Sequence, residues 1–397
     1  MKILIADKLS DGALNALQKA GLEAEFRPDL SADELPSAIA RFNVLVVRST
    51  RVTAETINAA DNLSLIVRAG AGVNTIDVAA ASAHGIYVTN CPGMNSDAVA
   101  ELAIGLLIAC DRRIVNATTE LRSGQWNKKE YGRARGLKGR TLGILGMGMI
   151  GQGVARRARG LEMQVVAWSR SLTRERAESL GVQFAESPSI VAQTSDAVSI
   201  HLAATAETKH LVNREFLEAM KDRAILINTS RGDLVDTAAL SEAILAKGLR
   251  VGLDVFEDEP GSGQAEFADV DLASIVTGTP HIGASTEQAS EAIADEVVRI
   301  IDSFRETGHP PNAVNLCART PATHSFVVRH YNRVGVLAGV LDALREEGIN
   351  VEEMENTIFD GTLAACCTLQ LDQPPSPQII DQLTSDENII QVHLEAR

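Results

Sequence analysis

The stretch GILGMGMIGQGVARRARG (residues 143–160) decides the fold of this chain. Its glycines Gly146, Gly148 and Gly151 follow a short apolar run and open a helical pattern. The first glycine allows a tight turn, the second lets the backbone approach a pyrophosphate, and the third lets the helix pack against the strand. The N-terminus of the helix then faces the phosphates. The stretch therefore predicts a Rossmann unit that binds a dinucleotide.

The strand that follows, VVAWSRS (165–171), bears on the choice of dinucleotide. A carboxylate usually stands at the end of this strand and bonds the ribose 2′-hydroxyl, but here Ser169 and Arg170 take its place. A carboxylate repels a 2′-phosphate, whereas a serine and an arginine accept one. This favours NADP(H) or the use of both cofactors. In the alternative interpretation, Arg170 is a solvated loop residue and other contacts hold NAD.

Short β-branched runs alternate with amphipathic helices on both sides of the glycine stretch. The upstream strands run from KILIAD (2–7) to GIYVTN (85–90), and the downstream ones from RTLGILG (140–146) to SIVTGTPHI (274–282). This alternation predicts two parallel α/β sheets. Residues 322–397 instead follow a βαββαβ order, which is the ferredoxin-like pattern of a small separate domain.

Two long helices are also expected. NSDAVAELAIGLLIACDRRIVNATTELRSG (95–124) reads as one helix capped by Asn95 or Ser96, and it is apolar enough to span two domains or to form a subunit interface. STEQASEAIADEVVRIIDSFRETG (285–308) reads as another helix, which ends at Gly308.

Composition limits the classes of function. The chain has 397 residues and a formal net charge of −15, which disfavours nucleic acid and anionic membranes as partners but leaves small anions to local arginines. Its five cysteines show no ligand-like spacing with histidine, so we expect no metal and a reducing compartment. No apolar run is long enough to span a membrane. The sequence predicts a soluble, cytoplasmic protein.

Three segments in the second sheet carry candidate catalytic residues. INTSRGDLVD (227–236) contains Arg231, LDVFEDEP (253–260) contains Glu259, and GTPHIGAST (278–286) contains His281. Each residue lies just past a strand, at the edge where open α/β sheets bind ligands. Arginine can fork onto a carboxylate, histidine can exchange a proton near neutral pH, and glutamate can orient the ring. Taken singly, each also fits an ion pair or a helix cap.

As a set, these segments resemble the D-2-hydroxyacid dehydrogenase family over essentially residues 1–310. RAGAGVNTIDV (68–78), NSDAVAELAIGLL (95–107) and LKGRTLGILGMGMIG (137–151) carry the resemblance further. It implies Arg231 as the binder of the substrate carboxylate, His281 as acid/base and Glu259 as its partner. It further implies cofactor contacts at Met149, Ile150, Thr229, Ser230, Asp254, Gly283 and Ala284, and substrate contacts at Ala71, Gly72, Val73 and Asn95.

The resemblance also implies how the chain divides. A flavodoxin-like substrate domain, residues 1–96 and 285–320, is expected on both sides of an inserted Rossmann cofactor domain, residues 97–284. The ferredoxin-like domain then covers residues 321–397. The expected fold is thus α/β, with two doubly wound parallel-sheet domains and a small C-terminal βαββαβ domain.

Further basic residues bear on the substrate. Arg48 and Arg51 end the strand VVRSTR (46–51), and Lys128 and Lys129 follow the first long helix. A phosphate on the substrate needs such cations, although surface solvation is the alternative for each. The segments around them are similar to those of family members that oxidise D-3-phosphoglycerate to 3-phosphohydroxypyruvate, at the start of L-serine biosynthesis. The alternatives are an NADP(H)-dependent glyoxylate or hydroxypyruvate reductase and a nucleotide-sensing corepressor of the same fold.

The tail resembles an ACT domain, a small module that binds amino acids. HYNRVGVLAGVLDALREEGINV (330–351) carries the likeness, with Val334 where the usual pattern has proline. The resemblance implies that His330, Asn332 and Asn350 bind L-serine between paired domains. Alternatively, the tail only joins subunits. Either interpretation predicts a homodimer or homotetramer.

Overall fold

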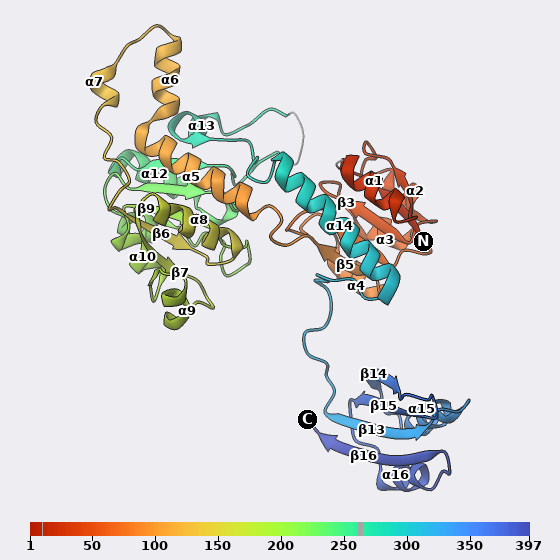
Figure 1. The fold of residues 1–397 in the computed structure, drawn as a ribbon. Helices are drawn as coiled ribbons and strands as arrows, with labels where there is room; N and C mark the ends of the chain where they lie inside the picture. The colour runs from red at the N-terminus through yellow and green to blue at the C-terminus, as the bar shows by residue number, and fades with distance from the viewer. Residues whose placement is uncertain (10, 261–264) are drawn as a thin grey trace. The chain divides into compact units, whose positions relative to one another are not determined.

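The computed structural model describes residues 1–9, 11–260 and 265–397. The chain forms two compact units, Met1–Asn315 and Leu316–Arg397, which are described separately below (Figure 1). Within the described residues, the helices are all too short or too polar to cross a membrane.

The first sheet contains five parallel strands in the order β2-β1-β3-β4-β5, which is the flavodoxin-like order. Its strands are short and, in β3 and β4, almost fully buried because helices cover both faces. The late helix α14 covers one face, where Ile293, Val297 and Ile300 pack with Leu17 of α1. The elements are β1 (Lys2–Ile5), α1 (Asp11–Lys19), β2 (Glu23–Phe26), α2 (Leu35–Ile39), β3 (Val44–Val47), α3 (Ala54–Asn58), β4 (Leu65–Arg68), α4 (Val78–Ala83), β5 (Tyr87–Asn90) and α14 (Glu287–Thr307).

The second sheet contains seven parallel strands in the order β12-β11-β10-β9-β6-β7-β8, which is the Rossmann order. Apolar residues of α5 and α8 fill one face, and those of α11 and α12 fill the other. The elements are α5 (Ser96–Arg112), α6 (Ile114–Arg122), α7 (Lys128–Tyr131), β6 (Thr141–Leu145), α8 (Met149–Gly160), β7 (Gln164–Trp168), α9 (Arg174–Ser179), β8 (Gln183–Phe184), α10 (Pro188–Thr194), β9 (Ala197–Ile200), α11 (Arg214–Ala219), β10 (Ile225–Asn228), the 3₁₀ turn η1 (Gly232–Leu234), α12 (Thr237–Lys247), β11 (Arg250–Leu253), α13 (Val270–Ile275) and β12 (Thr277–Gly278).

The prediction of a single helix over 95–124 is wrong. Arg113 adopts a left-handed conformation with φ of 51°, which ends α5 and starts α6 in a new direction. Its side chain turns away from the helix, donates to the carbonyl and the carboxylate of Glu130, and stacks over Tyr131 at 4.7 Å. Asn95 is the N-cap residue of α5, as one of the two expected alternatives, but its side chain makes no capping hydrogen bond.

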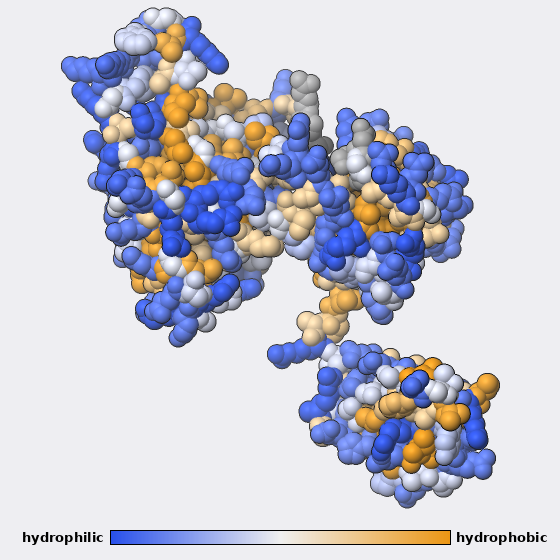
Figure 2. Space-filling view, in the orientation of Figure 1, coloured by the Kyte–Doolittle hydropathy of each residue, from blue (hydrophilic) through white to orange (hydrophobic). Residues whose placement is uncertain are grey.

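The C-terminal unit is a four-stranded antiparallel sheet in the order β14-β15-β13-β16, with two helices on one face. The order of elements is the expected βαββαβ: β13 (His324–Tyr331), α15 (Val336–Glu346), β14 (Val351–Ile358), β15 (Ala364–Leu371), α16 (Pro377–Thr384) and β16 (Ile389–Ala396). Figure 2 shows apolar surface on the visible face of this unit. Large apolar side chains that stay exposed include Val334, Met354, Ile358, Phe359 and Leu363. The edge strand β14 and the adjoining loops are therefore uncovered in the single unit.

The fold class expected from the sequence is confirmed, because both parallel sheets and the antiparallel one are present in the expected order. Two short edge strands, β2 and β8, go beyond the expected ones. The division between a substrate domain and a cofactor domain stays a prediction, since the first compact unit contains both parallel sheets.

Candidate active site

The glycine loop after β6 has a different environment at each glycine. At Gly146 (φ 99°), an added Cβ would lie 2.3 Å from the carbonyl oxygen of His201, and at Gly151 it would lie 2.0 Å from the carbonyl oxygen of Gly146. At Gly148, by contrast, an added Cβ would meet nothing within 4 Å. Gly148 is the N-cap of α8 and has no side chain to cap the first N–H groups. The loop is thus packed where the first and third glycines stand and open where a pyrophosphate would lie, so it fits the cofactor.

Polar groups from the neighbouring strands border this loop. Thr229 and Ser230 follow β10 and are buried, and Oγ1 of Thr229 has no hydrogen-bond partner within the described residues. His201, just past β9, shares a 2.8 Å hydrogen bond with the Ser199 hydroxyl. Burial lowers the pKa of His201 to about 3, so the ring stays neutral at physiological pH. The unpaired Thr229 hydroxyl is the kind of group that a bound ligand satisfies.

The other expected cofactor residues lie around the same loop. Ser169 and Arg170 form a turn after β7, in which the Leu172 amide donates to the Ser169 carbonyl, and Arg170 is exposed. Met149 is exposed, whereas Ile150 is partly buried. No contact within the described part of the chain fixes the Arg170 guanidinium by a hydrogen bond or an ion pair, so a bound cofactor can reach it.

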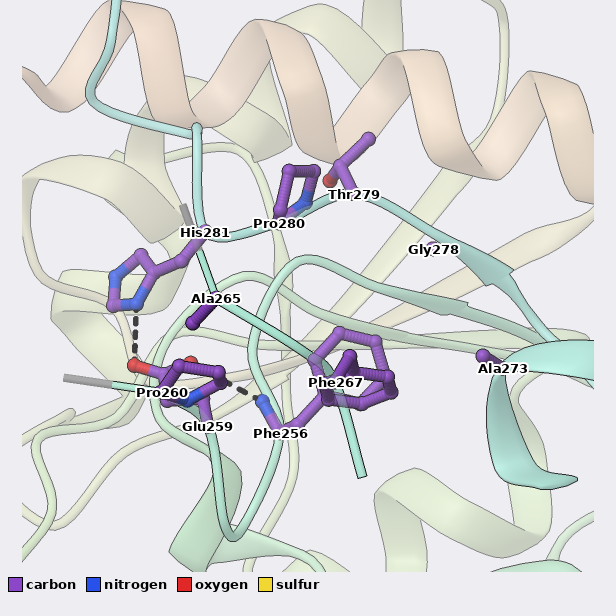
Figure 3. Close-up of a pocket in the computed structure, with 10 residues that line it drawn as sticks. All are labelled: Phe256, Glu259, Pro260, Ala265, Phe267, Ala273, Gly278, Thr279, Pro280 and His281. Atoms are coloured by element: carbon purple, nitrogen blue, oxygen red, sulfur yellow. Dashed lines mark hydrogen bonds and ion pairs between the residues drawn. The ribbon is translucent and has the colours of Figure 1, made fainter. Parts of the chain in front are cut away.

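His281 and Glu259 form a close pair. Nδ1 of His281 donates to Oε1 of Glu259 across 2.6 Å, which leaves Nε2 as the ring nitrogen open to substrate (Figure 3). Burial tends to raise the pKa of Glu259, but the bond from His281 and the nearby positive charges lower it below its usual value. Glu259 is therefore ionised at neutral pH and orients the imidazole.

Asp254 holds the loop that carries His281. Its side chain is buried and accepts from the hydroxyl of Thr279 (2.6 Å), the amide of Ile282 (2.8 Å) and the amide of Gly283 (2.8 Å). Both carboxylate oxygens are thus engaged within the protein. The observed contacts of Asp254 are structural, and the expected contact with a nicotinamide amide stays a prediction.

A mostly apolar cavity of about 400 Å³ borders the pair on one side (Figure 3). Phe256 and Phe267 pack edge to face in its wall, with ring centroids 4.8 Å apart. Pro260 and Pro280 also line it, next to Glu259 and His281. The His281–Glu259 pair therefore has an apolar environment on this side, which strengthens its electrostatic interactions.

The other side of the pair faces a cleft of about 380 Å³ whose lining comes from both parallel sheets. The lining includes Arg48, Arg68, Asn95, Arg231, Glu259 and His281. Arg231 is held through its backbone and its side chain: Nδ2 of Asn228 donates to its carbonyl across 2.8 Å, and its Nη1 donates to the Ser230 carbonyl across 2.6 Å. Its Nη2 would lie 3.1 Å from a Cβ added at Gly72, so the loop 70–75 closes on this arginine. The predicted catalytic residues and the predicted substrate loop therefore meet in one place.

Arg68 is the residue that the sequence analysis missed. Arg68 is the last residue of β4, whose neighbour β3 is followed by Arg48. The Nε of Arg68 is buried and has no hydrogen-bond partner among the described residues. Burial lowers the pKa of Arg68, and the charges of Arg231 and Arg48 lower it further. Arg68 is the first residue of the segment RAGAGVNTIDV (68–78), and its position at a strand end was the signal available.

Several expected residues lie elsewhere. Arg51 is exposed and absent from the lining, as are Lys128 and Lys129 on α7. Ala71 is also exposed, although its carbonyl accepts from Asn90. Thus only Arg48 of the four basic residues singled out for a phosphate reaches the cleft.

The three effector residues do not come together within one C-terminal unit. His330 lies at the far end of β13, whereas Asn350 precedes β14 at the opposite end of the sheet. The His330 ring is buried, and its Nδ1 donates to the Tyr331 carbonyl while Nε2 lies 3.3 Å from Oδ1 of Asn356. Asn332 donates to the Thr362 carbonyl. Within a single unit, a shared site for these residues is therefore not formed.

Comparison with known proteins agrees with this geometry. Residues 104–283 match the family described as D-isomer specific 2-hydroxyacid dehydrogenase, NAD binding domain. A hydroxypyruvate reductase of Thermotoga maritima is 42% identical over 281 residues, which cover 70% of this chain and 89% of the relative. The chain belongs to the D-isomer specific 2-hydroxyacid dehydrogenase family.

Family members with different substrates and cofactors are similar to this chain. A D-3-phosphoglycerate dehydrogenase of Archaeoglobus fulgidus is 39% identical over 330 residues, 83% of this chain and 62% of the relative. The chain thus spans about six tenths of that relative. A crystal structure of an NADPH-dependent glyoxylate/hydroxypyruvate reductase from Sinorhizobium meliloti, in complex with NADP and malonate, superposes with a TM-score of 0.68 at 28% identity, covering 79% of this chain and 96% of that one.

Proposed function

We propose that this dehydrogenase oxidises D-3-phosphoglycerate to 3-phosphohydroxypyruvate with NAD or NADP, the first step towards L-serine. The observation that carries the proposal is the cleft in which Arg48, Arg68 and Arg231 converge beside the His281–Glu259 pair. Among the described residues, none of these arginines forms an ion pair with a carboxylate. Such a cleft fits a small acid with an anionic group at each end.

Each residue then has a role in the reaction. Arg231 binds the carboxylate, and Arg48 with Arg68 binds the phosphate. His281 takes the C2 hydroxyl proton through Nε2, and Glu259 stabilises the resulting imidazolium. A nicotinamide dinucleotide held at the Gly146–Gly151 loop would supply the acceptor for the hydride of C2. In the reverse direction, the His281 imidazolium returns the proton to the forming alkoxide, while Arg231 holds the carboxylate.

Initial rates with phosphorylated and unphosphorylated acids test the substrate. We expect a higher kcat/KM for D-3-phosphoglycerate than for D-glycerate. Arg48→Ala and Arg68→Ala are expected to raise KM for D-3-phosphoglycerate much more than KM for D-glycerate. Arg51→Ala is the control, because Arg51 is exposed and outside the cleft. Equal effects on both acids would leave the phosphate assignment without support.

The second candidate is an NADP(H)-dependent glyoxylate or hydroxypyruvate reductase. The Ser169–Arg170 turn favours it, as do the similar reductases of Thermotoga maritima and Sinorhizobium meliloti. The same assay run in reverse, with 3-phosphohydroxypyruvate, hydroxypyruvate and glyoxylate, separates the two. A preference for glyoxylate or hydroxypyruvate over the phosphorylated acid would select the reductase.

The C-terminal unit supports regulation and pairing. Because His330 and Asn350 lie at opposite ends of one unit, an L-serine site formed by them requires a second copy. The exposed apolar side chains around β14 offer surface for this pairing, in a homodimer or homotetramer. L-Serine is expected to inhibit the wild type, and Asn332→Ala or Asn350→Ala to remove inhibition while turnover is kept. If L-serine still inhibits both variants, the proposed effector site is contradicted, and the tail then serves only to join subunits.

A further inference from the structure

A single carboxylate oxygen accepts hydrogen bonds from three backbone N–H groups at the carboxyl edge of the first sheet. Oδ2 of Asp7 accepts from the amides of Arg48 (2.6 Å), Ser49 (3.0 Å) and Thr50 (2.9 Å). Bonds from N–H groups to an ionised acceptor are stronger than neutral ones, and consecutive amides converge on one point only in a tight turn. The carboxylate therefore fixes the backbone course of residues 48–50.

Sheet pairing places the two partners together. Asp7 comes two residues after β1, and Arg48 comes directly after β3. The two strands are parallel neighbours, with Ile5 opposite Val46, and the Ala6 amide donates to the Val46 carbonyl. The position of Asp7 relative to the Arg48 backbone is thus set by the core of the sheet and not by the loop itself.

The turn held by Asp7 carries part of the cleft lining. Arg48 and Ser49 both line the cleft, together with Arg231 and His281. The charge of Asp7 also reaches Arg68, where it opposes the like-charge repulsion from Arg48 and Arg231. The Asp7 carboxylate thus lies near a cluster of arginines, but the hydrogen bonds that it accepts come from the backbone and not from the arginine side chains.

We propose that Asp7 is a positioning residue: its carboxylate shapes the 48–50 turn so that Arg48 meets the anionic group of the substrate farthest from C2. This inference rests on the proposed function, in which that group is a phosphate. Asp7 acts through Arg48 and does not touch the substrate.

A double-mutant cycle tests the coupling between the two residues. Asp7→Ala is expected to raise KM for D-3-phosphoglycerate on the order of tenfold, with a smaller change for D-glycerate and in kcat. In an Arg48→Ala background the same change is expected to add little, because the residue through which Asp7 acts is gone. Additive effects of the two substitutions, or equal effects on both acids, would overturn the proposal.

Conservative and remote variants separate positioning from general stability. Asp7→Asn keeps an acceptor oxygen in the same place and is expected to recover most of the wild-type KM, which also covers the case in which Asp7→Ala folds poorly. Asp61→Ala removes an exposed carboxylate from the same part of the chain and is the control. If Asp7→Asn behaves like a general loss of folding, with a lowered Tm and equal losses on both acids, Asp7 is structural only and the proposal fails.

Inorganic phosphate distinguishes failure of this inference from failure of the proposed function. A wild type without preference for the phosphorylated acid contradicts the proposed function. The cycle is then read from the inhibition constant of inorganic phosphate, which does not depend on the natural substrate. Asp7→Ala is expected to weaken this inhibition in the wild-type background and not in the Arg48→Ala background. Inhibition that is absent, or equally weakened in both backgrounds, would overturn the role of Asp7.

Discussion

The carboxyl edges of the two parallel sheets differ in how they are prepared for ligands. The edge of the seven-stranded sheet has a glycine loop that is open at Gly148 and a neutral, partly buried His201 beside it. The edge of the five-stranded sheet carries Arg48 and Arg68, with Asp7 tied to the adjoining backbone. One edge thus offers open space at a glycine backbone, and the other presents two arginines to the cleft. Sheets of the same class acquire different tasks from the few residues that follow their strands.

The largest effect is expected from the acid/base residue. His281→Ala is expected to lower turnover at least roughly a hundredfold, since Nε2 of this ring is the group placed to take the proton. Steady-state rates check this, with His309→Ala as the control because His309 is exposed on a different segment. Near-normal turnover in His281→Ala would contradict the role of His281 as the acid/base residue.

Substitution of Arg170 tests whether a cation contributes to cofactor binding at the edge of the seven-stranded sheet. Arg170→Ala is expected to weaken NADP(H) binding by about 1.5–3 kcal/mol, as for the loss of one charged hydrogen bond, with little change for NAD(H). Fluorescence titration with both cofactors measures it. Arg174→Ala is the control, because Arg174 already stacks over Phe184 and pairs with Glu186. Equal losses for both cofactors would mean that Arg170 recognises no 2′-phosphate.

Two glycines in one loop separate packing from binding. Gly151→Ala is expected to lower the free energy of unfolding by about 1–3 kcal/mol, because the added Cβ meets a backbone carbonyl that cannot move aside. Gly148→Ala is expected to leave stability nearly unchanged and to weaken dinucleotide binding, because its Cβ enters open space. Urea unfolding and cofactor titration on both variants check this. The same loss of stability in both would contradict an open cradle at Gly148.

The smallest effect is a shift along the pH axis. In oxidation, His281 takes the proton through Nε2 while its Nδ1 donates to the Glu259 carboxylate. Burial raises the pKa of Glu259, but this bond and nearby positive charges lower it below its usual value. Glu259→Gln removes that charge, so the acidic limb of kcat/KM is expected to move to lower pH by about one unit. Glu257→Gln is the matched control, because Glu257 lies in the same loop and pairs with His210. If the acidic limb of kcat/KM does not move in Glu259→Gln, the Glu259 carboxylate does not influence the proton transfer.

Sequence reasoning placed correctly those structural features that depend on local spacing. The glycine loop, the strand ends that carry Arg231 and His281, and the βαββαβ order of the tail all follow from residues close together in the chain. The pairing of Glu259 with His281 was also expected, from the resemblance to the dehydrogenase family. Such features need no knowledge of how distant segments pack.

The features that were missed depend on tertiary contacts. The helix break at Arg113 arises because its side chain finds Glu130 and Tyr131, which lie outside the helix pattern. Arg68 is distinguished from other strand-end arginines only by the cleft that forms around it. In the tail, His330 is buried, and its Nε2 lies 3.3 Å from Oδ1 of Asn356 on another strand. Periodicity and motif spacing carry no information on these contacts.

The three hydrogen bonds of Asp254 give the site an order of assembly. The carboxylate stands after β11, but its donors Thr279, Ile282 and Gly283 come after β12, which is an edge strand and the last strand of that sheet in the chain. The glycine loop precedes both and depends on neither. During refolding, cofactor binding is therefore expected to return before turnover, with the delay set by the docking of β12. Simultaneous recovery of the two signals in a stopped-flow experiment would mean that the sheet closes in one step.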